Sequence, residues 1–190
     1  MTTHGRGVFS RMWLGSVADR LLRTVAVPIL LLRPHDSPPA TGYRRILVAI
    51  GERAELEVLE PALTVGALAG TTSYVLAHVV EPPPPVIPPV PVHQPNLGPE
   101  WIEARHRAAV AFLEPLAPHL CARGVATETH VVVGRPAAAE LLDLARTTGA
   151  DLIALGTHGR RGLERLVLGS VADKVVRGSD VPVLVTPVLA

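Results

Sequence analysis

The stretch that decides the fold lies near the carboxyl end, where residues 151–186 read DLIALGTHGRRGLERLVLGSVADKVVRGSDVPVLVT. An apolar run over Leu152–Leu155 is followed by a glycine-containing loop, a helical pattern from Ser170 to about Arg177 and a second apolar run over Val181–Thr186. Short, continuously apolar runs on either side of a helix are typical of buried parallel strands. This stretch therefore predicts a strand, a helix and a strand of a parallel sheet.

The same alternation extends toward the amino end. Further strands are predicted over Ile46–Ile50, Tyr74–Val80 and Thr127–Val133, and helices over about 54–69, from Trp101 to about Arg123, and from Pro136 to about Thr148. Pro115 and Pro118 should kink or split the second helix. The pattern predicts an α/β fold with an open five-stranded parallel sheet and helices on both faces.

Composition limits the classes of protein and partner. The 190 residues are 48% hydrophobic and 18% charged, which favours one well-buried core. The formal net charge is +1 and no four basic residues are consecutive, so neither nucleic acid nor an anionic membrane is expected as a partner. The longest apolar run, Val25–Leu32, is much shorter than the roughly 20 residues of a membrane-spanning helix. A single cysteine, Cys121, excludes an internal disulfide and is compatible with the cytoplasm, which we expect as the location.

An internal repeat defines the organisation of the chain. Residues 3–30 align without gaps to residues 157–184 at a constant offset of 154, with 15 of 28 positions identical, including LGSVAD. The earlier copy lacks the strands that precede the later one. We therefore expect residues 1–34 to be the last helix and strand of a first domain, 35–43 a linker and 44–188 a complete domain. A truncated gene, a misassigned start codon and a genuine remnant are all open as causes.

A proline-rich segment interrupts the complete domain. Nine of the 18 residues in 82–99 are proline, which excludes the interior of a helix or a sheet. The simplest interpretation is a semi-rigid surface loop; the alternatives are a lid over a site and a docking strip for a partner that binds proline-rich segments.

The glycine loop is the strongest candidate for chemistry. Gly156 and Gly159 follow a predicted strand, and Gly169-Ser170 opens a helix nine residues later. Glycines let backbone amides approach an anion, Ser170 can cap the helix, and free amides at a helix N-terminus attract phosphate. Nearby positive charge comes from Arg160, Arg161 and Arg165. The pattern predicts a phosphate cradle, although an ordinary strand–loop–helix turn fits the same spacing, and the P-loop signature is absent.

With these residues the chain resembles the universal stress protein family. The resemblance rests on Gly156-x2-Gly159-x9-Gly169-Ser170, on the ending Val181-Pro-Val-Leu-Val185, and on the strands Arg45–Ile50, Leu76–Val80 and Asp151–Gly156. It implies the strand order 3-2-1-4-5 and, in the nucleotide-binding branch, ATP held by the glycine motif with Val79 beside adenine. The implied adenine-nucleotide site comprises Gly156, Thr157, His158, Gly159, Arg160, Gly169, Ser170, Val171, Ile50, Gly51 and Val79.

One departure from the family pattern bears on metal binding. Members commonly have Asp-Gly-Ser after the first strand, whereas this chain has Gly51-Glu52-Arg53. ATP with or without Mg²⁺ as a regulatory ligand, without efficient turnover, is the leading hypothesis. A nucleotide-free dimerising scaffold of the same family is the alternative, and an enzyme that transfers adenylyl groups is a weaker third.

Other candidate residues have simpler structural interpretations. His78 is predicted to be a satisfied core or edge histidine, and Asp173 to act on the dipole of the last helix. No nucleophile–base pair and no zinc spacing occurs, so neither catalytic nor metal-binding residues are predicted.

The last strand is the expected assembly element. The resemblance implies a homodimer through Val181–Thr186, or antiparallel pairing of that strand with Val27–Leu32 within the chain. The amino-terminal copy lacks the strands of a site of its own, so no independent nucleotide site is expected there.

Overall fold

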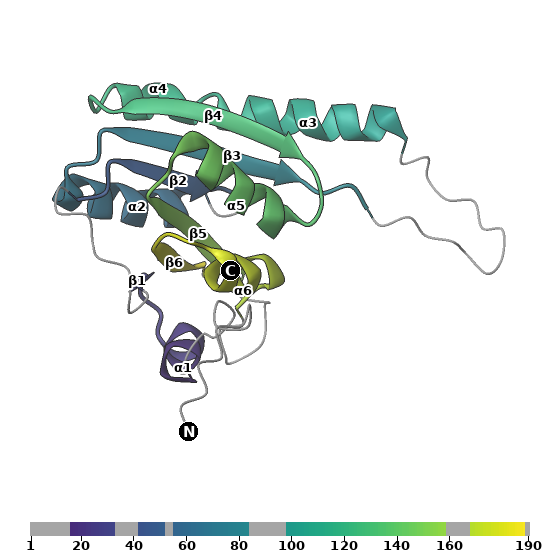
Figure 1. The fold of residues 1–190 in the computed structure, drawn as a ribbon. Coiled ribbons are helices and arrows are strands. Elements are labelled where there is room, and N and C mark those ends of the chain that lie inside the picture. Colours follow the sequence, from purple (N-terminus) through teal and green to yellow (C-terminus); the bar gives the residue numbers. More distant parts are fainter. Residues whose placement is uncertain (1–15, 33–41, 52–54, 84–97, 159–167, 189–190) are drawn as a thin grey trace, which may run out of the picture.

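The computed structural model describes residues 16–32, 42–51, 55–83, 98–158 and 168–188, which form a single sheet with helices on both faces (Figure 1). In chain order the elements are α1 (Ser16–Thr24), β1 (Ile29–Leu31), β2 (Arg45–Ala49), α2 (Glu55–Ala69), β3 (Ser73–Val80), α3 (Pro99–Leu113), α4 (Leu116–Cys121), β4 (Ala126–Val133), α5 (Ala137–Thr148), β5 (Leu152–His158), α6 (Ser170–Gly178) and β6 (Val183–Val188).

The sheet has six strands in the order β1-β6-β5-β2-β3-β4. The strands β2 to β6 pair in parallel, whereas β1 pairs antiparallel with β6. The predicted α/β fold with a mostly parallel sheet is confirmed, but the sheet has six strands rather than five, because a strand from the amino-terminal repeat adds to its edge. When β1 is set aside and counting starts at β2, the parallel strands lie in the order 3-2-1-4-5.

The pairing of β1 with β6 confirms the predicted association within the chain. Leu30 lies opposite Leu184, with Ile29 opposite Val185 and Leu31 opposite Val183. At the repeat offset of 154, Leu30 pairs with its own equivalent, whereas Ile29 pairs with the equivalent of Leu31 and Leu31 with the equivalent of Ile29. The two copies thus meet about a local pseudo-twofold axis through Leu30 and Leu184, and β1 covers an edge of β6 that would otherwise be open.

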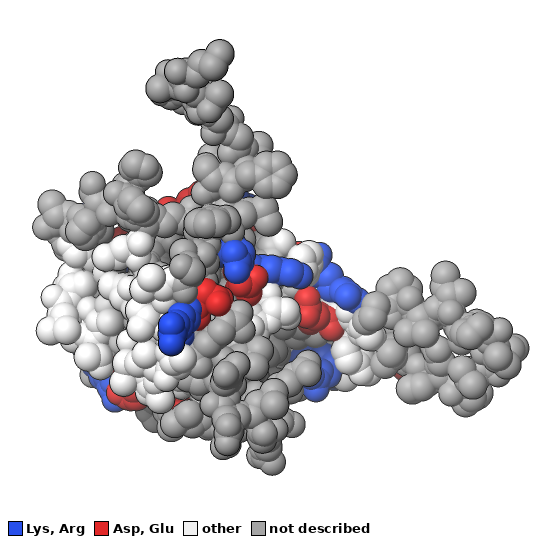
Figure 2. All heavy atoms as spheres, turned by 90° about the horizontal axis from the view of Figure 1, so that it is seen from below, with Lys and Arg blue, Asp and Glu red and all other residues white. Residues whose placement is uncertain are grey.

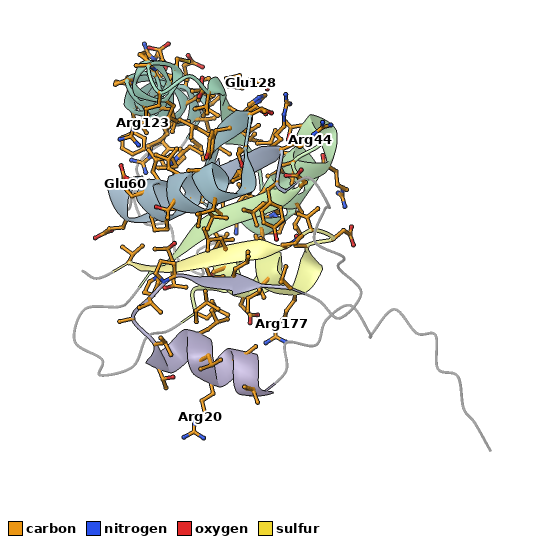
Figure 3. The ribbon with its side chains drawn as sticks, turned by 90° about the vertical axis from the view of Figure 1, so that its left-hand side faces the viewer. Arg20, Arg44, Glu60, Arg123, Glu128 and Arg177 are labelled. Carbon is orange, nitrogen blue, oxygen red and sulfur yellow. The ribbon has the colours of Figure 1, made fainter. Side chains whose placement is uncertain are left out.

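Alternate residues of the inner strands point to opposite faces, and each face is covered by its own helices. In β2, Leu47 belongs to the core cluster that α5 and α6 form, whereas Ile46 and Val48 belong to the cluster of α2, α3 and α4. Leu22 of α1 joins the first cluster. On the second face, Arg123 and Glu60 point toward each other at 3.6 Å (Figure 3). Burial on both faces explains why these strands are continuously apolar.

Element boundaries agree with the predictions except near the carboxyl end. The helix predicted from Trp101 is split, since α3 ends at Leu113 and α4 begins after Pro115. The last strand begins at Val183 rather than Val181, because the Ser179 hydroxyl bonds both the amide and the carbonyl of Val181 and holds a turn there. β5 continues three residues past Leu155, through pairing with β6.

Candidate functional site

The candidate site is a cavity of about 570 Å³ at the carboxyl ends of β2, β3 and β5. In an open parallel sheet this edge is the usual ligand position, at the point where the strand order reverses. Here the reversal lies between β2 and β5, which are neighbours in the sheet. Predicted site residues that line the cavity are Ile50, Gly51, Val79, Gly156, Gly169, Ser170 and Val171. The fold therefore brings residues from four separate segments of the chain to one place.

The remaining predicted site residues are elsewhere or outside the described part of the chain. Thr157 is buried, and its hydroxyl points to the Thr186 carbonyl oxygen at 3.5 Å, away from the residues that line the cavity. The side chain of His158, together with Gly159 and Arg160, lies outside the described residues. The same is true of Arg161, Arg165, Glu52, Arg53 and most of the proline-rich segment.

The N-terminus of α6 borders the cavity. Gly169 is its N-cap in an extended conformation, and within the described residues no side chain makes a capping hydrogen bond there. The prediction that Ser170 caps this helix is therefore wrong: Ser170 is already the first helical residue, and its side chain is exposed. The first amides of a helix have no partner within the helix. Ser170, Val171 and Ala172, which carry those amides, all line the cavity.

A second helix N-terminus, that of α5, also borders the cavity but already has an acidic partner. The Glu81 carboxylate accepts a hydrogen bond of 2.7 Å from the backbone amide of Ala137, the first residue of α5. Glu81 and Ala137 both line the cavity. A carboxylate at this position satisfies an unpaired amide and favourably meets the helix dipole. As far as the described residues go, α6 is therefore the helix end whose amides are left for an anion.

His78 is a buried histidine with a defined partner. Its Nδ1 lies 2.8 Å from the carbonyl oxygen of Ile50, which can only accept, so this nitrogen carries the proton. The ring meets Phe112 edge-on, with the centroids 6.2 Å apart. The prediction of a satisfied histidine is confirmed. However, His78 and Glu81 also line the cavity, which the sequence analysis missed; their closeness to Val79 at the end of β3 was the available signal.

The described walls of the cavity are mainly apolar and carry one carboxylate. Val58, Leu141, Leu155 and Leu168 are buried residues that contribute to them. Glu81 is the acidic residue among the described lining residues, and the described residues contain no group of three or more potential metal ligands. Apolar walls with a few polar groups are usual for a small-molecule site.

The surface around the last helix is mixed in charge. Asp173 forms an ion pair with Arg177 at 2.9 Å on α6, outside the cavity lining, consistent with the structural role predicted for it. On the face shown in Figure 2, acidic and basic side chains lie next to each other. Within the described residues no helix is long and apolar enough to cross a membrane.

Similarity to known proteins identifies the family. The model of the universal stress protein family matches residues 42–187. The chain belongs to this family. A universal stress protein of Synechocystis is 32% identical over 152 residues, which are 76% of this chain and 97% of the relative.

Longer universal stress proteins match almost the whole chain. A relative from Mycobacterium tuberculosis is 28% identical over 188 residues, 95% of this chain but 58% of its own length. The structure of a universal stress protein from Archaeoglobus fulgidus DSM 4304 aligns with a TM-score of 0.69 and 25% identity, covering 98% of this chain and 60% of that chain. The chain therefore spans less than two thirds of these relatives.

One solved relative was determined with a nucleotide. It is the universal stress protein from Archaeoglobus fulgidus in complex with dAMP, which aligns with a TM-score of 0.50 and 21% identity, covering 75% of this chain and 97% of that chain. At this identity the likeness establishes a shared fold.

Proposed function

We propose that this universal stress protein binds ATP or a related adenine nucleotide in the cavity at the ends of β2, β3 and β5, as a regulatory ligand in the cytoplasm and without efficient turnover. The observation that carries the proposal is the meeting of Gly156, Gly169 and Ser170 with Gly51 and Val79 around one cavity. These residues come from the glycine motif and from the ends of β2 and β3, the parts that the family resemblance assigns to the nucleotide.

The phosphates are proposed to lie at α6. No side chain of the described residues caps its first amides, and Gly169 and Gly156 add no side-chain bulk beside them. The helix dipole and the unpaired amides both favour an anion here. The N-terminus of α5 is a poorer phosphate site because the Glu81 carboxylate already occupies it.

The base is proposed to lie toward the end of β3. Val79 is partly buried and lines the cavity, as do Val58 and Leu141 from the helices on opposite faces of the sheet. Apolar walls suit a flat, largely apolar base. The charged phosphates of the ligand would instead bind to the amides of α6. The A. fulgidus relative solved with dAMP supports an adenine nucleotide as the ligand.

The residues present suit a nucleotide better than a protein-bound metal. Gly51 stands where the family commonly has an aspartate, and the Glu81 carboxylate that lines the cavity is engaged at α5. When Mg²⁺ accompanies ATP, we propose that the phosphate oxygens and water supply most of its ligands.

The alternative is a nucleotide-free scaffold of the same family, which the glycine at position 51 favours. In that case assembly, not ligand binding, would be the function. We also propose that residues 1–34 correspond to the final helix and strand of another universal-stress domain, since α1 and β1 repeat α6 and β6 in sequence and β1 pairs with β6.

Isothermal titration of ATP, with and without Mg²⁺, tests the proposal, with product formation followed over time. We expect binding by the native chain that is lost in Gly159→Ile/Ser170→Leu and retained in Gly5→Ile/Ser16→Leu, which makes the same changes in the other copy of the repeat. Circular dichroism checks that each variant is folded. Absence of binding by the native chain would favour the scaffold, and rapid product formation would contradict a regulatory ligand.

A further inference from the structure

A second, smaller hollow adjoins the proposed nucleotide site at the end of β3. Its volume is about 170 Å³, and its lining residues are His78, Val79, Val80, Glu81, Trp101 and Arg105. Three of these, His78, Val79 and Glu81, also line the large cavity. The hollow is therefore next to the part of the site assigned to the base and not to the helix end assigned to the phosphates.

Trp101 lines this hollow but not the large cavity, and it brings an aromatic side chain to the site. It lies in the first turn of α3, which Pro99 opens, and it is partly buried. The guanidinium carbon of Arg105, one turn further along, lies 5.8 Å from the centroid of the indole ring. Such a cation–π contact restrains the ring. The hollow thus presents a flat aromatic side chain whose ring is restrained by a neighbouring lining residue, Arg105.

The geometry points to Trp101 as a base-contacting residue of the nucleotide site, selecting a purine over a pyrimidine. This inference rests on the proposed function. An indole offers a stacking surface to any base, but a two-ring base reaches further from Val79 toward α3 and covers more of it than a one-ring base does. Arg105 acts as a positioning residue that holds the indole.

The expected effect follows from the strength of base–aromatic stacking. Loss of one such contact weakens binding by about tenfold. Trp101→Leu should therefore weaken ATP binding by about tenfold and leave the weaker binding of CTP nearly unchanged. Trp101→Phe, which keeps an aromatic ring, should retain most of the preference for ATP.

The test uses the full chain, titrated with ATP and with CTP, in the native form and in Trp101→Leu and Trp101→Phe. The chain has two tryptophans, so Trp13→Phe serves both as the matched control and as the background in which the fluorescence of Trp101 is read alone. We expect ATP to change that fluorescence more than CTP does.

The outcomes separate the two proposals. If ATP binds the native chain and Trp101→Leu equally and leaves the Trp101 fluorescence unchanged, this inference is overturned and the proposed function stands. If the native chain binds no nucleotide, both fail. If Trp101→Leu does not fold, Trp101→Phe and the fluorescence decide: a retained ATP preference with a fluorescence change supports the inference, and no fluorescence change overturns it.

Discussion

Substitution of Leu22 tests whether the amino-terminal helix α1 packs on the folded core. Its side chain is 3% exposed and packs in the cluster of α5 and α6, whereas the adjacent Leu21 is 45% exposed. In Figure 3, α1 lies beside the sheet with Arg20 pointing away from it. The two leucines are therefore a matched pair, with the same chemistry and helix but different burial.

The cost of Leu22→Ala follows from this burial. Truncation of a buried leucine removes its transfer free energy and leaves a cavity, so the free energy of unfolding should fall by about 3 kcal/mol. For a protein of this size, the melting temperature should fall by about 6–12 °C. Leu21→Ala removes a side chain that is already half in water and should cost at most about 1 kcal/mol.

Urea unfolding of both variants, with hydrogen exchange at the amides of Ile29–Leu31, is the assay. Hydrogen exchange distinguishes a loss of global stability from local release of α1 and β1. After local release the amides of β1 would exchange faster, whereas the amides of the other strands would stay protected. If Leu22→Ala and Leu21→Ala had the same urea midpoint and the same exchange, α1 would not pack on the core and the argument would be refuted.

Three further predictions concern the core and the start of β2. Gly66→Ala should destabilise the fold by about 1–3 kcal/mol, because the new Cβ would overlap the hydroxyl oxygen of the buried Tyr74. Tyr74→Phe removes that oxygen, so in this background urea titration should show most of the cost gone. Burial raises the pKa of the Tyr74 hydroxyl. The stability that its neutral form supplies is therefore present below about pH 10 and is lost as the pH rises through the folded pKa. In urea titrations between about pH 8 and pH 11, the free energy of unfolding of Tyr74→Phe should fall less than that of the native chain. Asp151→Ala should cost about 2 kcal/mol in thermal unfolding, because the carboxylate accepts hydrogen bonds from the backbone amides of Arg44 at 2.8 Å and Arg45 at 3.1 Å. A change below about 0.5 kcal/mol would contradict this.

The sequence pattern was enough to predict the parallel strands, because burial on two faces leaves continuous apolar runs such as Ile46–Ile50. The extra strand also had a sequence signal, since the repeat made β1 an equivalent of β6. The ends of β5 and β6 were less predictable. They depend on cross-strand pairing, as of Gly156 with Thr186, and on the turn that Ser179 holds.

The glycine motif and the strand ends likewise predicted much of the cavity lining. What sequence reasoning missed are contacts between segments far apart in the chain. The Glu81 carboxylate caps a helix that begins 56 residues later, and Trp101 reaches the end of β3 from across the proline-rich segment. No local spacing encodes such contacts, because they depend on how the helices pack on the finished sheet.

The pairing of β1 with β6 has a consequence for assembly. Since the amino-terminal strand reaches β6 through a connecting segment, the strand of a second molecule can pair with β6 in the same register, with Leu30 opposite Leu184. Such domain swapping creates a dimer without any new ladder contact. The connection keeps the chain's own strand at an effective concentration on the order of mM, so pairing within the chain should predominate over exchange in dilute solution. Exchanged dimers should therefore arise mainly when the protein is refolded or stored at high concentration.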